Sequence, residues 1–201
     1  MVKRRRIILV FFIIFLTFMF SGFTKVKLNT SKSEVLIVYP ELEGFYNREM
    51  IFHYIECIEK ELSKKNIIKS NSFYLDLSME KNNLTPGQNI NNEIIIESAK
   101  NSNSDFAIVS KISDTRFHRT LKTGIALLEP ITANTTIIGN IKLETWLVDI
   151  SNNSSSTPII VEKNMKNRFG GLFIEKRFLQ RKILRHCIGE TIYKMEKKEL
   201  I

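Results

Sequence analysis

The sequence predicts an α+β domain in which a mixed β-sheet has helices packed on one face, preceded by an amino-terminal membrane segment. Two observations predict this class. Strand-like and helical patterns alternate along residues 34–112, and a pair of alternating strands over 135–165 precedes a long amphipathic helix. The expected order is therefore β-α-β-α-β, then a β-hairpin, then a carboxyl-terminal helix. A length of 201 residues leaves room for one such domain, from residue 34 to residue 201.

The first 25 residues have the pattern of a signal-anchor or signal peptide. Four basic residues, Lys3 to Arg6, precede an apolar run from Ile7 to Phe20 that only Thr17 interrupts. We expect the basic end to stay in the cytoplasm and the rest of the chain to be exported. The run up to Phe23 reaches the lower edge of the ~17–25 residues that span a bilayer. We favour a retained single-pass anchor, and cleavage near residue 24 stays open as the alternative.

The end of the apolar run resembles a bacterial lipoprotein signal in all but one position. Phe20, Ser21, Gly22 and Phe23 stand where such a signal reads Leu-Ser-Gly-Cys. Phe23 thus replaces the cysteine that takes the lipid, and without a thiolate no thioether forms, so we expect no lipidation. Residues 26–33 then form a polar spacer.

The net charge of +9 is concentrated in two segments. Lys3 to Arg6 contribute four positive charges beside the apolar run, and residues 163–198 contain eleven basic and three acidic residues. The part between them is slightly acidic. The charge therefore indicates a membrane flank and one basic carboxyl-terminal element, and no nucleic-acid-binding domain is expected.

The first half of the domain alternates strands and helices. The apolar run before Pro40 predicts a strand covered on both faces. Asn47 is placed to cap a helix whose apolar residues, including Ile51, Tyr54 and Ile58, recur at three and four. In order, the predicted elements are strand 34–39, helix 48–64, strand 72–77, loop 81–92, a helix capped by Asn92 and running to about 100, and strand 105–112.

The second half predicts a hairpin and a long helix. Residues 135–150 alternate, 151–157 form a polar turn, and 158–165 return. We expect the Trp146 ring to be at least half buried on the longer strand, on the face of Val148 and opposite Leu143. Helix 175–200 has one apolar stripe. The stripe consists of Leu179, Ile183, Cys187, Ile188, Ile192 and Met195.

Two short motifs resemble a known envelope fold. Residues 104–112 read Ser-Asp-Phe-Ala-Ile-Val-Ser-Lys-Ile, close to (A/S)-D-(Y/F)-x-(I/L)-x-G-x-(I/V), and Asp149 ends a long strand before a polar turn. Over residues 34–165 the chain is similar to the fold shared by the TolB amino-terminal domain, the curli secretion-channel lipoprotein and the lipoprotein activators of penicillin-binding proteins. In these families the aspartate starts a turn that usually reads D-x-x-(T/S)-G. This chain departs by lacking the lipobox cysteine and by having Asn152 and Asn153 in the turn. The resemblance implies a fold and carries no catalytic signature.

No group of residues marks a catalytic or metal site. There is no Gly-x-Ser-x-Gly motif, and no pair of carboxylates stands out. His53 and Cys57, four residues apart on one helix, have the spacing of metal ligands, but core packing is the favoured interpretation. Cys57 and Cys187 are expected as buried free thiols, with one long-range disulfide as the open alternative. We expect no cofactor.

Two basic groups are the predicted contact sites. Residues 115–136 lack a clear period, and we interpret them as a partner-contacting insertion. The exposed face of the last helix is either a solvated face or a contact for anionic lipid head groups or an acidic partner. The residues are Arg116, His118, Arg119 and Lys122 in the first group, and Arg177, Arg181 and Arg185 in the second.

The predicted function is that of a non-enzymatic, membrane-anchored envelope protein whose exported domain binds another envelope component. Two other classes stay open. An extracytoplasmic hydrolase would show convergent titratable groups in a cleft, and a lipid- or small-ligand-binding domain would show a cavity between sheet and helices. The sequence leaves the partner, the biological process and the oligomeric state open.

Overall fold

The computed structural model describes residues 34–43, 47–122, 134–170 and 176–201, and only the backbone of 114–122, 134–136, 167–170 and 176. The predicted membrane segment and the spacer lie outside the described residues. Within the described ranges, no helix is both long enough and apolar enough to cross a membrane.

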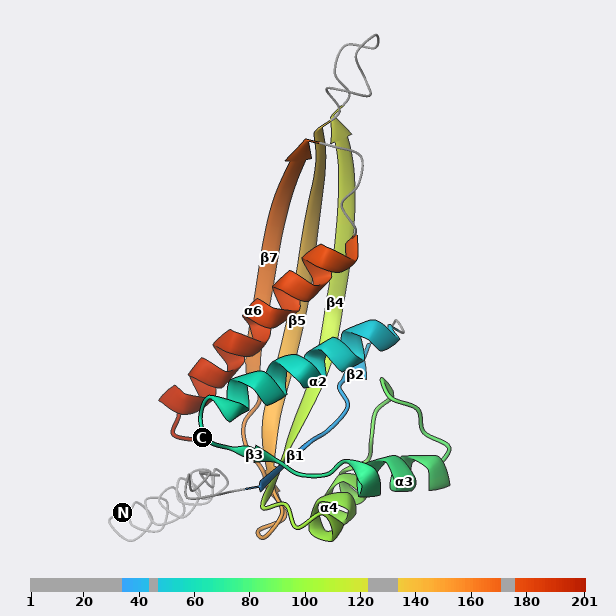
Figure 1. The fold of residues 1–201 in the computed structure, drawn as a ribbon, viewed down its shortest axis with the longest axis vertical. Helices are drawn as coiled ribbons and strands as arrows, with labels where there is room; N and C mark the ends of the chain where they lie inside the picture. Colours follow the sequence, from blue (N-terminus) through green and yellow to red (C-terminus); the bar gives the residue numbers. More distant parts are fainter. Residues whose placement is uncertain (1–33, 44–46, 123–133, 171–175) are drawn as a thin grey trace, which may run out of the picture.

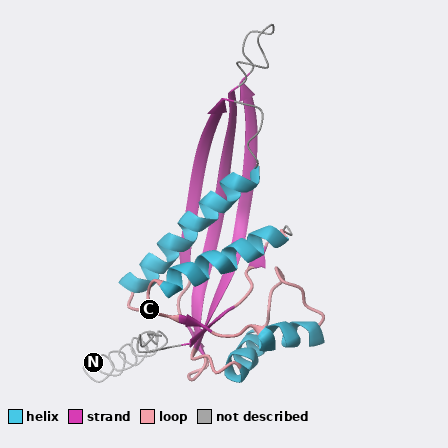
Figure 2. Cartoon of the chain, viewed as in Figure 1, coloured by secondary structure: helices cyan, strands magenta, loops and turns pink. Residues whose placement is uncertain are grey.

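One mixed sheet forms the centre of the domain (Figures 1 and 2). Strand β1 pairs in parallel with β3 and with β4, and β4 pairs antiparallel with β5, which also pairs antiparallel with β6 and β7. The predicted mixed α+β sheet and its carboxyl-terminal hairpin are therefore confirmed. The strands are β1 (Glu34–Ile37), β2 (Glu41–Leu42), β3 (Ile68–Lys69), β4 (Phe106–Lys122), β5 (Asn134–Asp149), β6 (Ser154–Ser155) and β7 (Ile159–Gly170).

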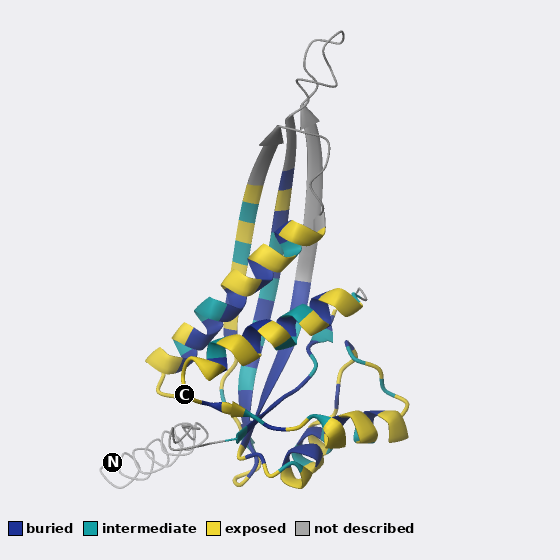
Figure 3. Cartoon of the chain, in the orientation of Figure 1, coloured by how far each residue is buried: buried dark blue, intermediate teal, exposed yellow. Residues whose placement is uncertain are grey.

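The helices cover both faces of the sheet, so the prediction that they lie on one face is wrong. Helices α2 (Arg48–Ser63) and α6 (Lys176–Lys197) lie side by side on one face (Figure 1). Helices α3 (Phe73–Lys81) and α4 (Asn92–Asn101) pack against the other face at its base. The reason is that Val35 and Ile37 of β1 are buried in one core and Leu36 in the other, so each face of this strand needs its own cover (Figure 3).

The predicted strand 72–77 is also wrong, because these residues belong to helix α3. Asn71 accepts a hydrogen bond from the Phe73 N–H at 2.9 Å and so helps to start the helix. Leu75 and Met79, four residues apart, are buried against the sheet. The parallel strand that follows α2 and pairs with β1 is instead the two-residue β3.

In the segment without a clear period, 115–136, the described residues 115–122 and 134–136 are strand. Strand β4 continues to Lys122, and β5 starts at Asn134. The register between them shifts between Ser113 and Arg116, which is a β-bulge or irregularity that resets the alternation of side chains. We call the backbone beyond this shift the arm: residues 116–122 of β4, 134–140 of β5 and 164–170 of β7. Figure 1 shows these three strands running past the start of α6.

The predictions for the helix cap, the buried stripe, Trp146 and the cysteines are confirmed. The Asn47 side chain accepts from the Met50 N–H at 3.1 Å and caps α2. All six predicted members of the α6 stripe are buried. The Trp146 ring is at least half buried beside Val148, while Leu143 lies in the other core. Both cysteines are buried free thiols.

The turn after β5 keeps the geometry that the resemblance implies. The Asp149 carboxylate accepts from the backbone N–H and from the side-chain amide of Asn152, at 3.0 and 2.8 Å. Asn153 then has φ 50°, in the left-handed region. This is the position where the family pattern has glycine, and asparagine tolerates that conformation better than most residues.

Candidate interaction surfaces

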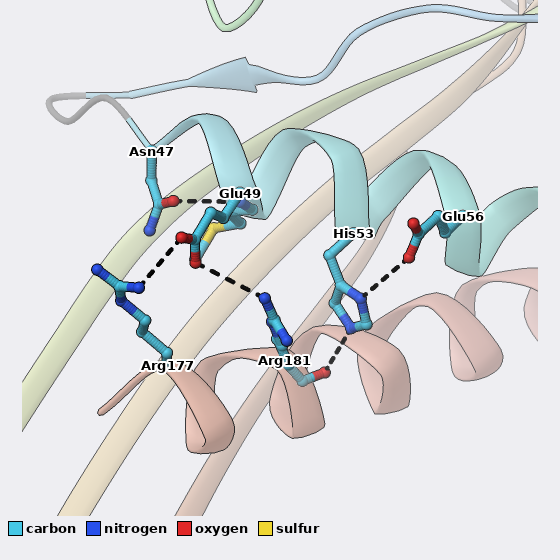
Figure 4. A network of polar contacts seen from close by, with 7 residues as sticks. Asn47, Glu49, His53, Glu56, Arg177 and Arg181 are labelled. Carbon is cyan, nitrogen blue, oxygen red and sulfur yellow. Dashed lines mark hydrogen bonds and ion pairs between the residues drawn. The ribbon is translucent and has the colours of Figure 1, made fainter. Parts of the chain in front are cut away.

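Helices α2 and α6 meet along a seam of exposed charged side chains (Figure 4). Glu49, in the first turn of α2, lies between Arg177 and Arg181 of α6, at 3.1 and 3.7 Å. The His53 ring lies 3.3 Å from the Arg181 carbonyl oxygen and 3.8 Å from Glu56. Because Glu49 and both arginines are exposed, each ion pair contributes at most about 1 kcal/mol.

The seam itself is filled. The hollow between Glu49, His53 and Arg181 has a volume of about 10 Å³, which is at the limit for a single water molecule. An open groove follows it along α2, with a volume of about 340 Å³. Its lining is formed by His53, Glu56, Cys57, Lys60, Glu61, Lys64 and Arg185.

The geometry of this groove does not activate a nucleophile. The Cys57 sulfur lies 3.5 Å from His53 Nε2, which brings a thiol and an imidazole together. Burial nevertheless raises the pKa of the Cys57 thiol, and the nearby Arg185 only partly offsets this rise. A catalytic cysteine needs a lowered pKa, so the thiol form of Cys57 is the stable one. In the described part of the chain, no three His, Cys, Asp or Glu side chains form a group that could bind a metal ion.

The first predicted basic group lies on the arm. Strand β4 places His118 opposite Ile138, Arg119 opposite Ile137 and Lys122 opposite Asn134, and Arg116 is opposite Asn140 just after the register shift. The side chains of the four basic residues lie outside the described residues. Strand β7 adds Lys166 and Arg168 opposite Ile138 and Thr136, and the Lys166 side chain is exposed.

The second predicted basic group is on α6, and it is exposed as expected. Arg177, Arg181 and Arg185 all lie on the solvent side of the helix, opposite its buried stripe. The first two also contact Glu49 of α2. The structure does not bring this row and the four basic residues of β4 into one described cluster.

The outer face of the sheet, away from α2 and α6, carries a ladder of charges. Lys111 contacts Glu41 and Glu43 at 3.8 and 3.3 Å, and Lys142 contacts Glu144 at 2.5 Å. The hydrogen bond to Glu43 raises the pKa of Lys111, and the one to Glu144 raises the pKa of Lys142. On this face two lysines are thus paired with three glutamates, and all five side chains are partly exposed to solvent.

A larger groove lies beside these charged side chains, and no sequence pattern indicates it. It has a volume of about 500 Å³ and is formed by the ends of β1 and β2, by β4 and β5, and by the loop that leads into α4. Its lining includes Trp146, which was predicted only as a core residue, and four amide side chains of residues 88–92. Three of these amides were predicted as loop, and Asn92 was predicted as a helix cap. The lining residues are Val38, Tyr39, Glu41, Gln88, Asn89, Ile90, Asn91, Asn92, Val109, Ser110 and Trp146.

Comparison with known proteins gives structural neighbours only. No family model matches the sequence, and no curated protein matches it. The lipoprotein GNA1162 from Neisseria meningitidis has a TM-score of 0.46 and 11% identity, over 82% of this chain and 99% of that chain. The hypothetical protein CT253 from Chlamydia trachomatis has a TM-score of 0.44 and 12% identity, over 84% and 98%.

The LpoB carboxyl-terminal domain from Escherichia coli has a TM-score of 0.41 and 13% identity, over 72% of this chain and 92% of that chain. These structural neighbours agree with the resemblance to envelope lipoproteins, including the activators of penicillin-binding proteins, that the sequence indicates. At these scores the likeness assigns no function to this chain, and the function proposed below depends on the residues of the chain itself.

Proposed function

We propose that this is a non-enzymatic cell-envelope protein that is tethered by its first 25 residues and binds another envelope protein through the arm. The observation that carries the proposal is the projection of the arm past α6. Within the described residues, β7 pairs only with β5, and β4 beyond Ile112 pairs only with β5. The arm therefore presents two strand edges, which are templates for pairing with another chain.

The position of the tether supports a partner located away from the anchoring membrane. Strand β1, the first described element, pairs with the first residues of β4 and lies at the base of the sheet, at the end opposite the arm (Figure 1). Strand β4 has 17 residues and spans about 55 Å at ~3.3 Å per residue. The spacer 26–33 reaches at most about 29 Å. The tip of the arm can therefore not rest on the membrane that anchors the base of the sheet.

Side chains at the base support the same orientation. Phe73, Tyr74 and Leu77 of α3 are 58%, 40% and 37% exposed, and the two rings pack edge to face at 5.5 Å. Exposed aromatic residues of this kind are favoured at the interface between membrane and water. We infer that the base faces the membrane and that the basic arm faces an acidic surface of a protein partner.

The enzyme alternative lacks support in the described residues. Cys57 and Cys187 have raised pKa values, and Tyr54 is fully buried, so none of them is an activated nucleophile. The carboxylates of the outer face are paired with Lys111 and Lys142, and of them only Glu41 is among the described residues that line a groove, so they do not converge on a cleft. A hydrolase would require convergent groups with perturbed pKa values.

We expect the first 25 residues to insert into the membrane with their basic end in the cytoplasm. Protease added to cells with a permeabilised outer layer should digest the domain from residue 34 onward. A protease-protected domain that fractionates with the cytoplasm would contradict this topology. An engineered cysteine at Lys198, labelled from outside by a membrane-impermeant reagent, provides an independent readout.

We expect charge reversal on the arm to weaken partner binding at least tenfold. The full chain, with a photo-crosslinking amino acid at His118, should form an adduct with an extracytoplasmic protein in intact cells. Arg116→Glu with Arg119→Glu should remove most of that adduct, because each change replaces attraction to an acidic partner by repulsion. The amount of adduct on a denaturing gel is the measurement.

The matched control is Lys197→Glu with Lys198→Glu, at the far end of α6, which makes the same charge change away from the arm. This variant should form the adduct at the level of the unaltered chain. Equal loss in both variants would show a general charge effect and would refute the arm as the site. An adduct with lipid alone would also refute the proposal of a protein partner.

A further inference from the structure

We propose that the 500 Å³ groove beside Trp146 is a binding site for a neutral saccharide. Its volume falls in the ~300–1,000 Å³ range of small-ligand sites. The groove lies on the face of the sheet opposite α2 and α6, and none of its lining residues belongs to the arm. The inference therefore goes beyond the proposed protein contact and does not depend on it.

The floor of the groove is aromatic and apolar. Trp146 of β5 is partly exposed there, and its register partner on β4 is Val109. Val38 and Ile90 extend the apolar floor and are themselves buried, so their positions are fixed by the core. An indole ring on a fixed floor offers a flat apolar surface with one N–H donor, which suits the C–H face of a pyranose ring.

The wall of the groove is made of amide side chains that are held in place. Gln88 accepts from the Thr85 N–H at 2.7 Å, and Asn91 accepts from the Glu93 N–H at 3.2 Å. These bonds use the amide oxygens, so the NH₂ groups of both residues remain as donors. Asn89 and Asn92 are exposed beside them and offer both a donor and an acceptor. Hydroxyl groups of a sugar also donate and accept, and they match this set.

The loop that carries these amides is anchored to the sheet. The Leu42 N–H donates to the Gly87 carbonyl at 2.8 Å, which ties the loop to β2. Gly87 has φ 100°, a conformation that favours glycine. A wall that is ordered before the ligand arrives reduces the entropy lost on binding.

The same residues disfavour other classes of ligand. Glu41 is the charged side chain among the described lining residues, and its partner Lys111, 3.8 Å away, lies outside this lining, so an anion would meet the carboxylate first. An extended peptide would need free backbone groups, but the Val38 N–H already donates to Ile108 and the Leu42 N–H to Gly87. An alkyl chain bound in the groove would cover the amide wall without hydrogen-bonding to it, which is unfavourable.

The test uses the fact that Trp146 is the one tryptophan of the chain. The full chain, in a detergent without a sugar head group, is titrated with maltotriose, cellotriose and the N-acetylglucosamine trimer. We expect a saturable change in tryptophan emission for at least one of them, with a dissociation constant in the millimolar range or below. Asn89→Ala with Asn92→Ala should weaken this binding at least tenfold.

Two controls separate the groove from the rest of the surface. Asn164→Ala removes an exposed amide of β7 on the same sheet face outside the groove, and it should leave the affinity unchanged. Trp146→Phe should also weaken binding. Because this variant lacks the tryptophan emission, its affinity is measured by calorimetry. The absence of a saturable change with all three trisaccharides would overturn the proposal. Equal affinity in the Asn89/Asn92 variant, or a preference for an acidic sugar or a peptide, would overturn it as well.

Discussion

Removing residues 176–201 is expected to leave a chain that does not fold. Helix α6 supplies a continuous stripe to the larger core, and each fully buried Leu, Ile or Met side chain contributes about 1.5–3 kcal/mol. Four such side chains are already comparable with the ~5–15 kcal/mol net stability of a typical domain. The buried residues of this segment include Leu179, Ile183, Leu184, Cys187, Ile188, Ile192, Met195 and Leu200.

A single substitution makes the same prediction quantitative. Ile183 is 0% exposed, and Ile183→Ala should lower the free energy of unfolding by about 2–5 kcal/mol. Urea unfolding of the full chain, followed by circular dichroism, measures this loss. The matched control replaces Arg177, Arg181 and Arg185 on the exposed side of the same helix by Gln.

The triple Gln variant should lose no more than about 1 kcal/mol per ion pair with Glu49. A triple variant that unfolds would show that the basic row of α6 is structural and would contradict its description as a solvent-exposed row. A truncated chain that retains a cooperative transition would show that the sheet and α2 fold without α6.

The elements that the sequence predicts well are those whose signal lies within one segment. The predicted helix 48–64 corresponds to α2 (Arg48–Ser63), and 175–200 corresponds to α6 (Lys176–Lys197). In both, the apolar period and the buried face coincide, so local spacing determines which side packs. The helix predicted from Asn92 also exists, with its cap one residue earlier at Asn91.

The elements that the sequence predicts poorly depend on contacts made elsewhere. Helix α3 has exposed Phe73, Tyr74 and Leu77 beside its buried residues, so apolar side chains on both sides imitate a strand. The register shift after Ser113 breaks the alternation that would identify the upper part of β4. The Trp146 groove joins a loop and a strand more than fifty residues apart, and no local pattern records that meeting.

Ser110 shows how one departure from the family pattern is accommodated. The pattern has glycine at this position, and Ser110 is buried. Its hydroxyl accepts a hydrogen bond from the Tyr54 hydroxyl at 2.5 Å and lies 2.7 Å from the Thr145 hydroxyl. The added polar group is thus satisfied inside the core by α2 and β5, as a buried hydroxyl must be.

The stability of the domain is expected to fall steeply between pH 9 and pH 12. Cys187 is 0% exposed, and burial raises the pKa of its thiol from the ordinary 9.0 to about 12. Below pH 9 both the folded and the unfolded chain have a neutral thiol. As the pH rises, the unfolded chain releases this proton first, so unfolding becomes favoured. Three pH units at 1.36 kcal/mol each give a loss of roughly 4 kcal/mol.

The pKa values of four further groups are shifted in the same direction. Burial raises the pKa of Tyr54 above its ordinary value, so its contribution is lost above about pH 10. Ion pairing raises the pKa values of the partly exposed Lys111, Lys142 and Lys163, so their stabilisation of the folded state is also lost as the pH rises. The measurement is urea unfolding of the full chain at pH 8 and at pH 11.5, with reductant, followed by circular dichroism.

Cys187→Ala separates the thiol from the other groups. This variant should be less stable than the unaltered chain at pH 8, because it leaves a small cavity beside Ile141, whose carbonyl oxygen the thiol approaches at 3.8 Å. Its stability should nevertheless fall by roughly 3 kcal/mol less between pH 8 and pH 11.5, because no buried thiol remains to ionise in the unfolded chain. Equal losses in the two proteins would show that Cys187 ionises as easily in the folded chain as in the unfolded chain, and that water reaches it from the side of β5.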